Sequence, residues 1–330
     1  MKNKKYVLVT GGAGYIGAHM AGLLLETGYK VVVFDDLSTG VRAWTPAGAE
    51  FVRGDLGRLE DCRKLFKRFP ISAVTHFAAK IVVPESVADP ILYYRNNTGG
   101  TLNLLAAMRE AGVRRLVFSS TAAVYGSPRR VPVTEAEPAA PLSPYGASKL
   151  MVEQVLRDSA KAGLLEFIAL RYFNVAGWDS RRRWPAEGRP VPTHLISNAM
   201  GALFAGKKLV VCGTDYATPD GTGVRDFIHV MDLCAAHLLA LKAFDRKVRN
   251  EVFNLGTGKG FSVLEVINAA GRIAGRPVPH ALGPRRSGDV ETVVASAAKA
   301  RRMLGWKTSR GLRDILSDEI GRRERDYAGK

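Results

Sequence analysis

Cysteine is scarce in this chain. Its 330 residues include three cysteines, Cys62, Cys212 and Cys234, which are odd in number and scattered along the sequence. This excludes the disulfide framework of small secreted domains, and the cysteines do not have metal-ligand spacing. We therefore expect a reducing, cytoplasmic location and no bound metal ion.

Long hydrophobic runs are also lacking. Although 46% of the residues are hydrophobic, no apolar stretch approaches the ~20 residues that a membrane-spanning helix needs. The short segment 1–5 leads directly into an apolar run that belongs to the fold, so no signal peptide is expected. These features indicate a globular protein without a membrane partner.

Acidic residues are outnumbered by basic ones. The chain has 31 Asp and Glu residues against 48 Lys and Arg residues, which gives a formal charge of +17. The basic residues are spread along the chain, and the densest clusters, at 181–183 and 322–325, lack interleaved aromatic residues. We therefore expect no nucleic-acid partner. A basic surface that attracts anionic substrates is the better interpretation.

What the chain does have is a glycine motif after an apolar run. Residues 6–10 form a continuous run typical of a buried parallel strand, and Gly11, Gly14 and Gly17 follow it. Such glycines permit a tight turn, close backbone approach to a ligand and close packing of a helix on a strand. The N–H groups of the following helix then face an anion, most simply a dinucleotide pyrophosphate. A purely structural turn is the alternative.

Two acidic residues indicate which dinucleotide is bound. The second apolar run, 31–34, ends at Asp35 and Asp36, and no arginine follows until Arg42. A carboxylate at Asp35 accepts hydrogen bonds from an adenosine ribose and repels a 2′-phosphate, so NAD is favoured over NADP. Asp36 fits a solvated turn equally well.

The following segments continue the alternation of strands and helices. Apolar runs that predict further strands lie at 51–55, 73–79, 115–120 and 166–171. Helical patterns lie at 59–69, 91–111 and 145–162. This order predicts an α/β fold, a Rossmann-type doubly wound parallel sheet whose ligands gather at the carboxyl ends of the strands.

The alternation breaks after Asn174, and residues 178–192 have the composition of a loop. We therefore predict an NAD-binding Rossmann domain over residues 1–174. Residues 175–330 are expected to form mainly a smaller C-terminal α/β substrate lobe, with some segments returning to the sheet. A second ligand would bind in the cleft between the two.

A tyrosine and a lysine carry the predicted chemistry. Tyr145 and Lys149 are four residues apart and therefore share one face of the predicted helix. A nearby lysine and a nicotinamide cation stabilise the phenolate and lower the pKa of the tyrosine. Such a tyrosine can exchange a proton with a substrate hydroxyl as hydride moves to the cofactor. Thr121 follows strand 115–120 and is the third predicted catalytic residue, since its hydroxyl can bridge phenol and substrate.

Eight motifs together suggest a family. They are GGAGYIG at 11–17, DDLSTG at 35–40, HFAA at 76–79, SSTAAVYG at 119–126, SPYGASK at 143–149, RYFN at 171–174, the stretch 215–230 and NLGTG at 254–258. On these motifs the chain resembles the extended short-chain dehydrogenases/reductases and, within them, the UDP-glucose 4-epimerase family. The likeness covers essentially the whole chain, and the stretch 215–230 is its most specific part.

The resemblance implies ligand contacts position by position. In addition to the three glycines and the catalytic residues, it implies NAD contacts at Tyr15, Ile16, Asp35, Asp36, Leu37, Ser38, Thr39, Gly40, Asp55, Leu56, Phe77, Ala78, Ala79, Lys80, Ile81, Asn96 and Phe173. It implies UDP-sugar contacts at Thr121, Tyr145, Asn174, His194, Leu195, Arg225, Arg286 and Asp289. Asp55 would meet the adenine, and the two arginines suit a diphosphate.

Some positions depart from the family pattern. Ile81 and Pro84 stand where related enzymes often carry Lys and Gly, which puts a lysine contact with the cofactor phosphate in doubt. Lys80 is one residue away and could replace it. His194 stands where some relatives have Asn, and Asp36 often appears as Asn.

The resemblance implies interconversion of UDP-glucose and UDP-galactose through a 4-keto sugar. The alternatives are a 4-epimerase of another UDP-sugar (UDP-N-acetylglucosamine, UDP-glucuronate or UDP-xylose) and a catalytically silent NAD-binding regulator. A 4,6-dehydratase is disfavoured, because Ala122 and Ala123 follow Thr121 where those relatives have Asp-Glu.

Two further expectations come from the resemblance. The chain is expected to form a homodimer in which helices 91–111 and 145–162 pack against their copies. Val293 lies four residues past Asp289, where relatives tend to carry Tyr if they accept only the plain hexose and a small residue if they also accept the 2-acetamido sugar. Valine predicts weaker but measurable activity on UDP-N-acetylglucosamine.

Overall fold

The computed structural model describes residues 5–182, 194–286 and 289–328, with the side chains of 326–328 left out. From residue 183 onward, the predicted loop 178–192 lies outside the described residues, as does Arg183. The chain opens with β1 (Tyr6–Thr10), α1 (Tyr15–Glu26) and β2 (Lys30–Asp35), as the glycine motif predicts. No helix in these described ranges is long and apolar enough to span a membrane.

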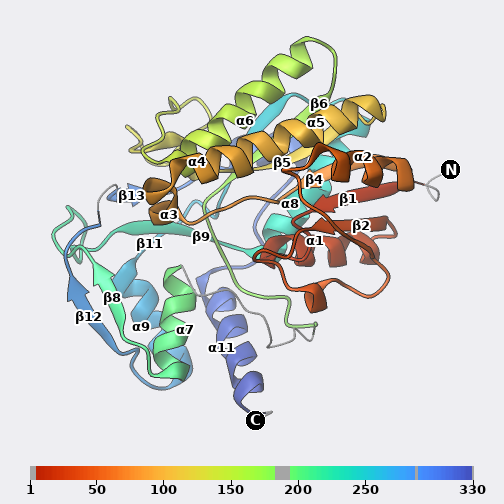
Figure 1. Cartoon of the computed structure of the whole chain (residues 1–330). Coiled ribbons are helices and arrows are strands. Elements are labelled where there is room, and N and C mark those ends of the chain that lie inside the picture. Colours follow the sequence, from red (N-terminus) through yellow and green to blue (C-terminus); the bar gives the residue numbers. More distant parts are fainter. Residues whose placement is uncertain (1–4, 183–193, 287–288, 329–330) are drawn as a thin grey trace.

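A seven-stranded parallel sheet forms the centre of the molecule (Figure 1). Its strand order is β10-β6-β5-β4-β1-β2-β3. The remaining strands are β3 (Glu50–Arg53), β4 (Ile71–His76), β5 (Arg115–Thr121), β6 (Glu166–Tyr172) and β10 (Glu251–Leu255). The predicted Rossmann-type fold is therefore confirmed. The strand β10 comes from the part of the chain after residue 174 and pairs in parallel with β6 at the edge.

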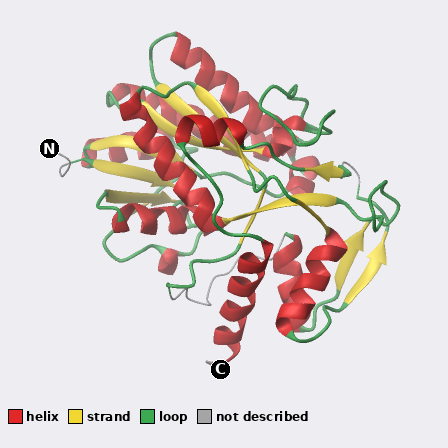
Figure 2. Ribbon diagram, turned by 180° about the vertical axis from the view of Figure 1, so that it is seen from behind, coloured by secondary structure: helices red, strands yellow, loops and turns green. Residues whose placement is uncertain are grey.

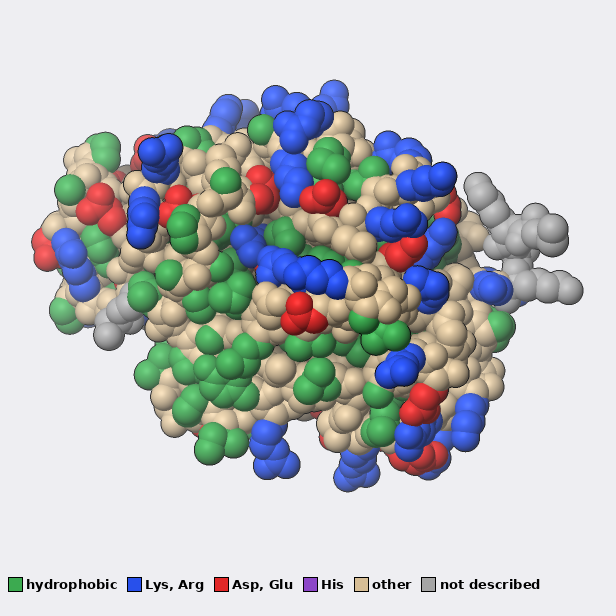
Figure 3. All heavy atoms as spheres, turned by 90° about the horizontal axis from the view of Figure 1, so that it is seen from above, with side chains coloured by type: hydrophobic (Ala, Val, Ile, Leu, Met, Phe, Trp, Pro, Cys, Tyr) green, Lys and Arg blue, Asp and Glu red, His purple; other side chains and the backbone are tan. Residues whose placement is uncertain are grey.

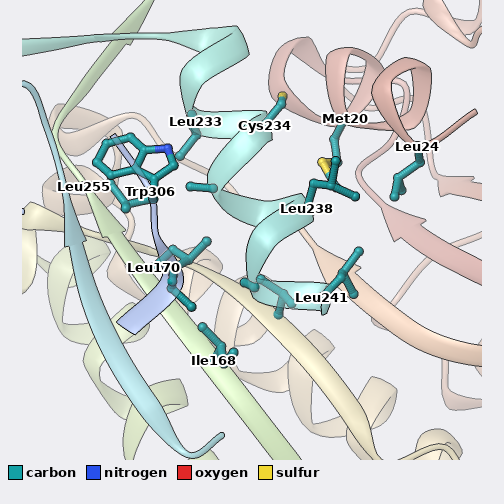
Figure 4. Close-up of a cluster of buried hydrophobic side chains, with 14 of the residues drawn as sticks. Met20, Leu24, Ile168, Leu170, Leu233, Cys234, Leu238, Leu241, Leu255 and Trp306 are labelled. Atoms are coloured by element: carbon teal, nitrogen blue, oxygen red, sulfur yellow. The ribbon is translucent and has the colours of Figure 1, made fainter. Parts of the chain in front are cut away.

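Helices cover both faces of this sheet, which explains the continuous apolar runs. Leu8 packs in one buried cluster and its neighbour Val9 in the other. The helices of the first face are α2 (Leu59–Arg68), α5 (Gly100–Glu110) and α6 (Pro144–Lys161). Those of the second face are α1, α8 (Val230–Ala243) and α10 (Ala298–Leu304). Figure 4 shows α8 between α1, whose Met20 lies beside Leu238, and β6, which carries Ile168 and Leu170.

The predicted helix 91–111 is interrupted. It consists of α4 (Pro90–Tyr93), a π-helical segment (Tyr94–Gly99) and α5, and α3 (Val83–Ala88) precedes it. Inside the π-segment, the Asn97 amide accepts from Lys80 N at 2.8 Å and donates to Lys80 O at 3.0 Å. The wider turn therefore directs a buried polar side chain at the loop after β4, a feature that apolar periodicity does not reveal.

A second group of elements lies beside the sheet (Figure 2). Its helices are α7 (Leu195–Ala205), α9 (Val263–Ala274) and α11 (Leu312–Ala328). Its strands are β7 (Asn174–Ala176), β8 (Leu209–Cys212), β9 (Val224–His229), β11 (Gly260–Ser262), β12 (His280–Gly283) and β13 (Thr292–Val293). Ile196, Val266 and Ile315 form its core. The strand β10 is part of the large sheet, and α8 packs against it. Residues after 174 therefore contribute both to the large sheet with its helices and to the second group, and the domain boundary at residue 174 stays a prediction.

Candidate functional site

The glycine turn between β1 and α1 forms a tight cradle. Gly11 has φ +66, and a Cβ on it would lie 2.6 Å from the backbone nitrogen of Ala78. A Cβ on Gly17 would lie 2.1 Å from the carbonyl oxygen of Gly11. Gly14 is the N-cap of α1 and has no side chain to bond its first N–H groups. The turn thus presents free backbone donors at a helix N-terminus, as a dinucleotide pyrophosphate requires.

Asp35 ends β2 beside this turn. Its carboxylate accepts from Ala13 N at 3.0 Å and from Leu37 N at 2.8 Å. Burial raises the pKa of Asp35, and these two hydrogen bonds oppose that effect. A carboxylate has about four acceptor positions, so two remain for another donor. The geometry fits a ribose and supports NAD as the cofactor.

The other acids at this edge organise their own turns. Asp36 is exposed and accepts from the backbone N and Oγ of Ser38 at 2.8 and 2.7 Å. Asp55 lies beyond the end of β3 and accepts from Gly57 N at 2.7 Å, while Leu56 is buried. Contacts of Asp36 and Asp55 with the cofactor stay predictions, as do those of Tyr15, Ile16, Ser38, Thr39 and Gly40.

The loop after β4 faces the same edge of the sheet. Asn97 holds the backbone of Lys80 at both its N–H and its carbonyl, and Asn96 donates to the Asn97 amide at 2.9 Å. Phe77 packs against His237 with the rings tilted and their centroids 4.6 Å apart. Ile81 is 48% exposed. Lys80 is the basic residue of this loop next to Ile81, where related enzymes often carry Lys. A contact of Lys80 with a cofactor phosphate stays a prediction, as do the cofactor contacts of Phe77, Ala78, Ala79 and Ile81.

Tyr145 and Thr121 meet although they come from different elements. Ser143 caps α6 by accepting from Gly146 N at 3.2 Å, which places Tyr145 in the first turn of the helix. Thr121 is the last residue of β5, and its Oγ accepts from Ala123 N at 3.1 Å. Burial raises the pKa of Tyr145, and a hydrogen bond with Thr121 opposes the rise.

Lys149 lies one helical turn further along α6. Its Nζ donates to Ser119 O at 3.0 Å and lies 5.0 Å from the centroid of the Phe118 ring. Burial lowers the pKa of Lys149 to about 7. The sequence analysis expects Lys149 together with a bound nicotinamide to lower the pKa of Tyr145, and in the protein alone burial raises that pKa. Tyr145 bonds Thr121, and Lys149 bonds Ser119 two residues earlier on the same strand, whereas the catalytic roles of Thr121, Tyr145 and Lys149 stay predictions.

Three of the predicted sugar-binding residues lie in two places, Arg225 and Asn174 at β9 and Arg286 in the segment after β12. Arg225 on β9 donates to Glu291 O at 3.2 Å and lies 3.8 Å from Asp289 Oδ1, and burial lowers its pKa. The side chain of Asn174 donates to Asp226 O at 3.2 Å on the same strand. Arg286 is exposed, and its Nε donates to Cys212 Sγ at 3.2 Å.

The remaining predicted sugar-binding residues lie at the start of α7 and in β13 of the second group. His194 is the exposed N-cap of α7, and Leu195 is its first residue. Val293 pairs with Arg225 across β13 and β9 and is buried in one cluster with Val124 and Phe173. That cluster adjoins Thr121 and Asn174 in the sequence, so Val293 belongs with the side of the lobe that faces the catalytic residues.

Several buried polar residues were not singled out from the sequence. Asp226 accepts from Thr257 N at 2.8 Å, Gly258 N at 3.0 Å and Ala295 N at 3.1 Å, and so ties three segments together. The Ser119 and Tyr172 hydroxyls bond each other next to the lysine. Hydrophobic periodicity does not reveal Asp226, Ser119 or Tyr172, because their hydrogen-bond partners are distant in the sequence.

Comparisons with known proteins agree with this geometry. Residues 7–256 match the NAD dependent epimerase/dehydratase family. A UDP-glucose 4-epimerase of Azospirillum brasilense is 49% identical over 301 residues, which cover 91% of this chain and 86% of that protein. A UDP-glucose 4-epimerase of Brucella ovis, crystallised with NAD, has a TM-score of 0.91 and 43% identity over 95% of this chain and 97% of its own.

A third relative was crystallised with both kinds of ligand. The UDP-glucose 4-epimerase of Bifidobacterium longum, in complex with NAD+ and UDP, has a TM-score of 0.91 and 39% identity, and covers 99% of this chain and 100% of its own. With its glycine cradle, its strand-end carboxylate and its Thr–Tyr–Lys group, the chain belongs to the NAD dependent epimerase/dehydratase family.

Proposed function

We propose that this chain is an NAD-dependent 4-epimerase that interconverts UDP-glucose and UDP-galactose. The observation that carries the proposal is the arrangement at the carboxyl end of β5, where Tyr145 bonds Thr121 and Lys149 bonds Ser119. That site adjoins a turn fit for a dinucleotide, in a chain that is 49% identical to a UDP-glucose 4-epimerase. UDP-glucuronate or UDP-xylose as the main substrate, and a silent NAD-binding regulator, remain the alternatives.

Each group has a defined task in this reaction. NAD, when bound, supplies a hydride acceptor and donor, and the glycine turn and Asp35 would hold it. The Tyr145 phenolate takes the proton of the sugar 4-hydroxyl, and the phenol so formed later returns it. Thr121 aligns that hydroxyl, and Lys149 adds positive charge when protonated. Arg225 and Arg286 would hold the diphosphate while the sugar turns over.

The direct test is turnover of a UDP-sugar. Purified protein with NAD is incubated with UDP-galactose, and UDP-glucose is measured by a coupled assay. We expect product without net consumption of NAD, because hydride leaves and returns to the same carbon. A panel with UDP-glucuronate and UDP-xylose tests the other substrates. Bound NAD without turnover of any UDP-sugar would favour the silent regulator.

The Asp35→Ala variant should bind NAD more weakly and discriminate less against NADP. Removing the carboxylate loses its charge-assisted hydrogen bonds to the ribose, which are worth about 1.5–3 kcal/mol. This loss corresponds to roughly a 10- to 100-fold higher Kd for NAD. Fluorescence titration with NADH and NADPH measures both values. Asp158→Ala, which removes an exposed carboxylate on α6 that contacts Gln154, is the matched control. An unchanged cofactor preference in Asp35→Ala would show that this carboxylate does not contact the ribose.

The Val293→Tyr variant should narrow the substrate range. We expect the wild type to act on UDP-N-acetylglucosamine, more weakly than on UDP-galactose, because an acetamido group needs room beside Val293. A tyrosine there should lower the rate ratio of the acetamido sugar to the plain hexose by about tenfold or more. Val210→Tyr, at a valine that is 48% exposed, controls for the added ring. No acetamido-sugar turnover by the wild type, or an unchanged ratio, contradicts the assignment.

We propose a cytoplasmic homodimer built on α5 and α6. Leu102, Val155 and Leu164 line a shallow hollow at these helices, and Leu102 and Met151 are each 48% exposed. Figure 3, viewed from above, shows hydrophobic side chains exposed among Lys and Arg. Light scattering tests the dimer, and a monomer at micromolar concentration would refute it. The absence of nucleic-acid and membrane partners stays a prediction.

A further inference from the structure

A buried carboxylate lies close to the catalytic residues without a task in the proposed chemistry. The Glu153 side chain is 0% exposed. It accepts from Ser120 Oγ at 2.6 Å, from Arg171 Nε at 2.8 Å and Nη2 at 2.5 Å, and from Arg157 Nη2 at 2.8 Å. A buried charge is kept at this burial only when it is paired in this way, and removing one partner leaves the others uncompensated.

The position of Glu153 links it to the reaction. On α6 it lies four residues past Lys149 and eight past Tyr145, so that the three side chains share one face. Ser120 and Arg171 lie opposite each other in the ladder between β5 and β6. One carboxylate therefore joins the helix that carries Tyr145 to two central strands. The junction is at the residue before Thr121.

A second set of contacts extends the junction. The Arg171 guanidinium lies 4.8 Å from the Tyr125 ring centroid, and the Tyr125 hydroxyl donates to Asn254 Oδ1 at 2.6 Å. Burial works to lower the pKa of Arg171, but the hydrogen bond and charge of Glu153 outweigh it and hold the pKa above its ordinary value. Through Tyr125 the network also reaches the short 3-10 helix Ala122–Tyr125 that follows Thr121 and the edge strand β10.

We propose that Glu153, acting through Ser120 and Arg171, is a positioning residue that sets the separation of the Tyr145 and Thr121 hydroxyls. This inference rests on the proposed function, in which proton transfer at Tyr145 is a required step. Such a transfer needs the heavy atoms within about 2.6–3.2 Å of each other. A small shift of α6 against β5 therefore slows the reaction. Most of the residues to which the proposed function assigns NAD and UDP binding, namely the glycine turn, Asp35, Arg225 and Arg286, lie on other segments, so we expect binding to be largely retained.

The test compares three variants of the whole protein. Glu153→Gln keeps the shape but removes the charge and turns an N–H toward an arginine. We expect kcat on UDP-galactose to fall about 10- to 100-fold, with KM and NAD content within about twofold of wild type. Ser120→Ala removes one hydrogen bond and should lower kcat by about 3- to 10-fold. Glu110→Gln, which breaks an exposed bidentate pair with Arg63, should leave kcat unchanged.

The split between kcat and KM separates positioning from mere stability. A purely structural Glu153 would lower Tm and yield, but would leave kcat per NAD-containing molecule within about twofold of wild type. That result overturns the proposal. If Glu153→Gln does not fold, Ser120→Ala decides, and an unchanged kcat there refutes the positioning role. Failure of the wild type to epimerise any UDP-sugar would instead refute the proposed function.

Discussion

The Tyr145→Phe variant should lose nearly all epimerisation while it keeps its fold and its cofactor. General acid–base catalysis by a positioned side chain is worth about 10²- to 10⁴-fold, and we expect kcat to fall by that factor. Tyr145 is 9% exposed, so the phenyl ring fills the same space and only the hydroxyl is removed. The coupled assay with UDP-galactose measures kcat, and the absorbance of bound NAD measures cofactor content.

A matched substitution controls for the loss of a tyrosine hydroxyl. Tyr6, at the start of β1, packs edge-on against Phe69 with ring centroids 5.4 Å apart, at the end of the parallel strands opposite to Thr121, the last residue of β5. Tyr6→Phe should leave kcat at the wild-type value. Near-normal turnover in Tyr145→Phe would mean that another group moves the proton, and the catalytic assignment would be wrong.

The Gly17→Ala variant should destabilise the glycine turn and impair NAD binding. Its new Cβ would lie 2.1 Å from the Gly11 carbonyl oxygen and 2.7 Å from Gly12 Cα, so the backbone of the turn must move. Overpacking of this kind costs roughly 2–3 kcal/mol. Since 1 kcal/mol shifts Tm by roughly 2–4 °C in domains of about 150–250 residues, we expect a fall of roughly 5–10 °C. NAD affinity should fall as well, because the N–H groups of the turn are displaced.

The control is a helical glycine with space around it. For Gly321 in α11, the nearest atom to a new Cβ is a terminal nitrogen of Arg325 at 3.7 Å. Gly321→Ala should therefore raise Tm slightly, since alanine is about 1 kcal/mol better than glycine in a helix. Thermal melts with and without NAD measure both variants. If Gly17→Ala had the Tm and the NAD affinity of the wild type, the close approach of α1 to the glycine turn would contribute neither to stability nor to NAD binding.

The predictions from sequence were accurate where the signal is local. The run 6–10 is β1 to the residue, and the predicted helix 59–69 is α2 (Leu59–Arg68). Both patterns report burial along one segment, which neighbouring residues determine. The same logic missed the π-segment Tyr94–Gly99, because one extra residue in a turn follows from the long-range partner of Asn97.

The substrate side was the hardest to predict from sequence. Family resemblance implies that Arg225 and Arg286 bind the diphosphate; in the structure Arg225 lies near Asp289, another predicted sugar-binding residue, and Arg286 bonds Cys212. The partner of a charged side chain on a loop or edge strand depends on which residues the fold brings close to it. Spacing along the chain does not reveal that partner. How both arginines bind UDP stays a prediction.

The sequence by itself determined the parallel sheet, the glycine turn and the shared helix face of Tyr145 and Lys149. These depend on hydrophobic periodicity, on residues without a Cβ and on the helical repeat, which all act over a few residues. Only the tertiary structure decided that Thr121 meets Tyr145, that β10 pairs with β6, and that Glu153 joins α6 to the central strands. Such contacts depend on how whole elements pack, because a buried polar group takes its partners from wherever the fold brings them.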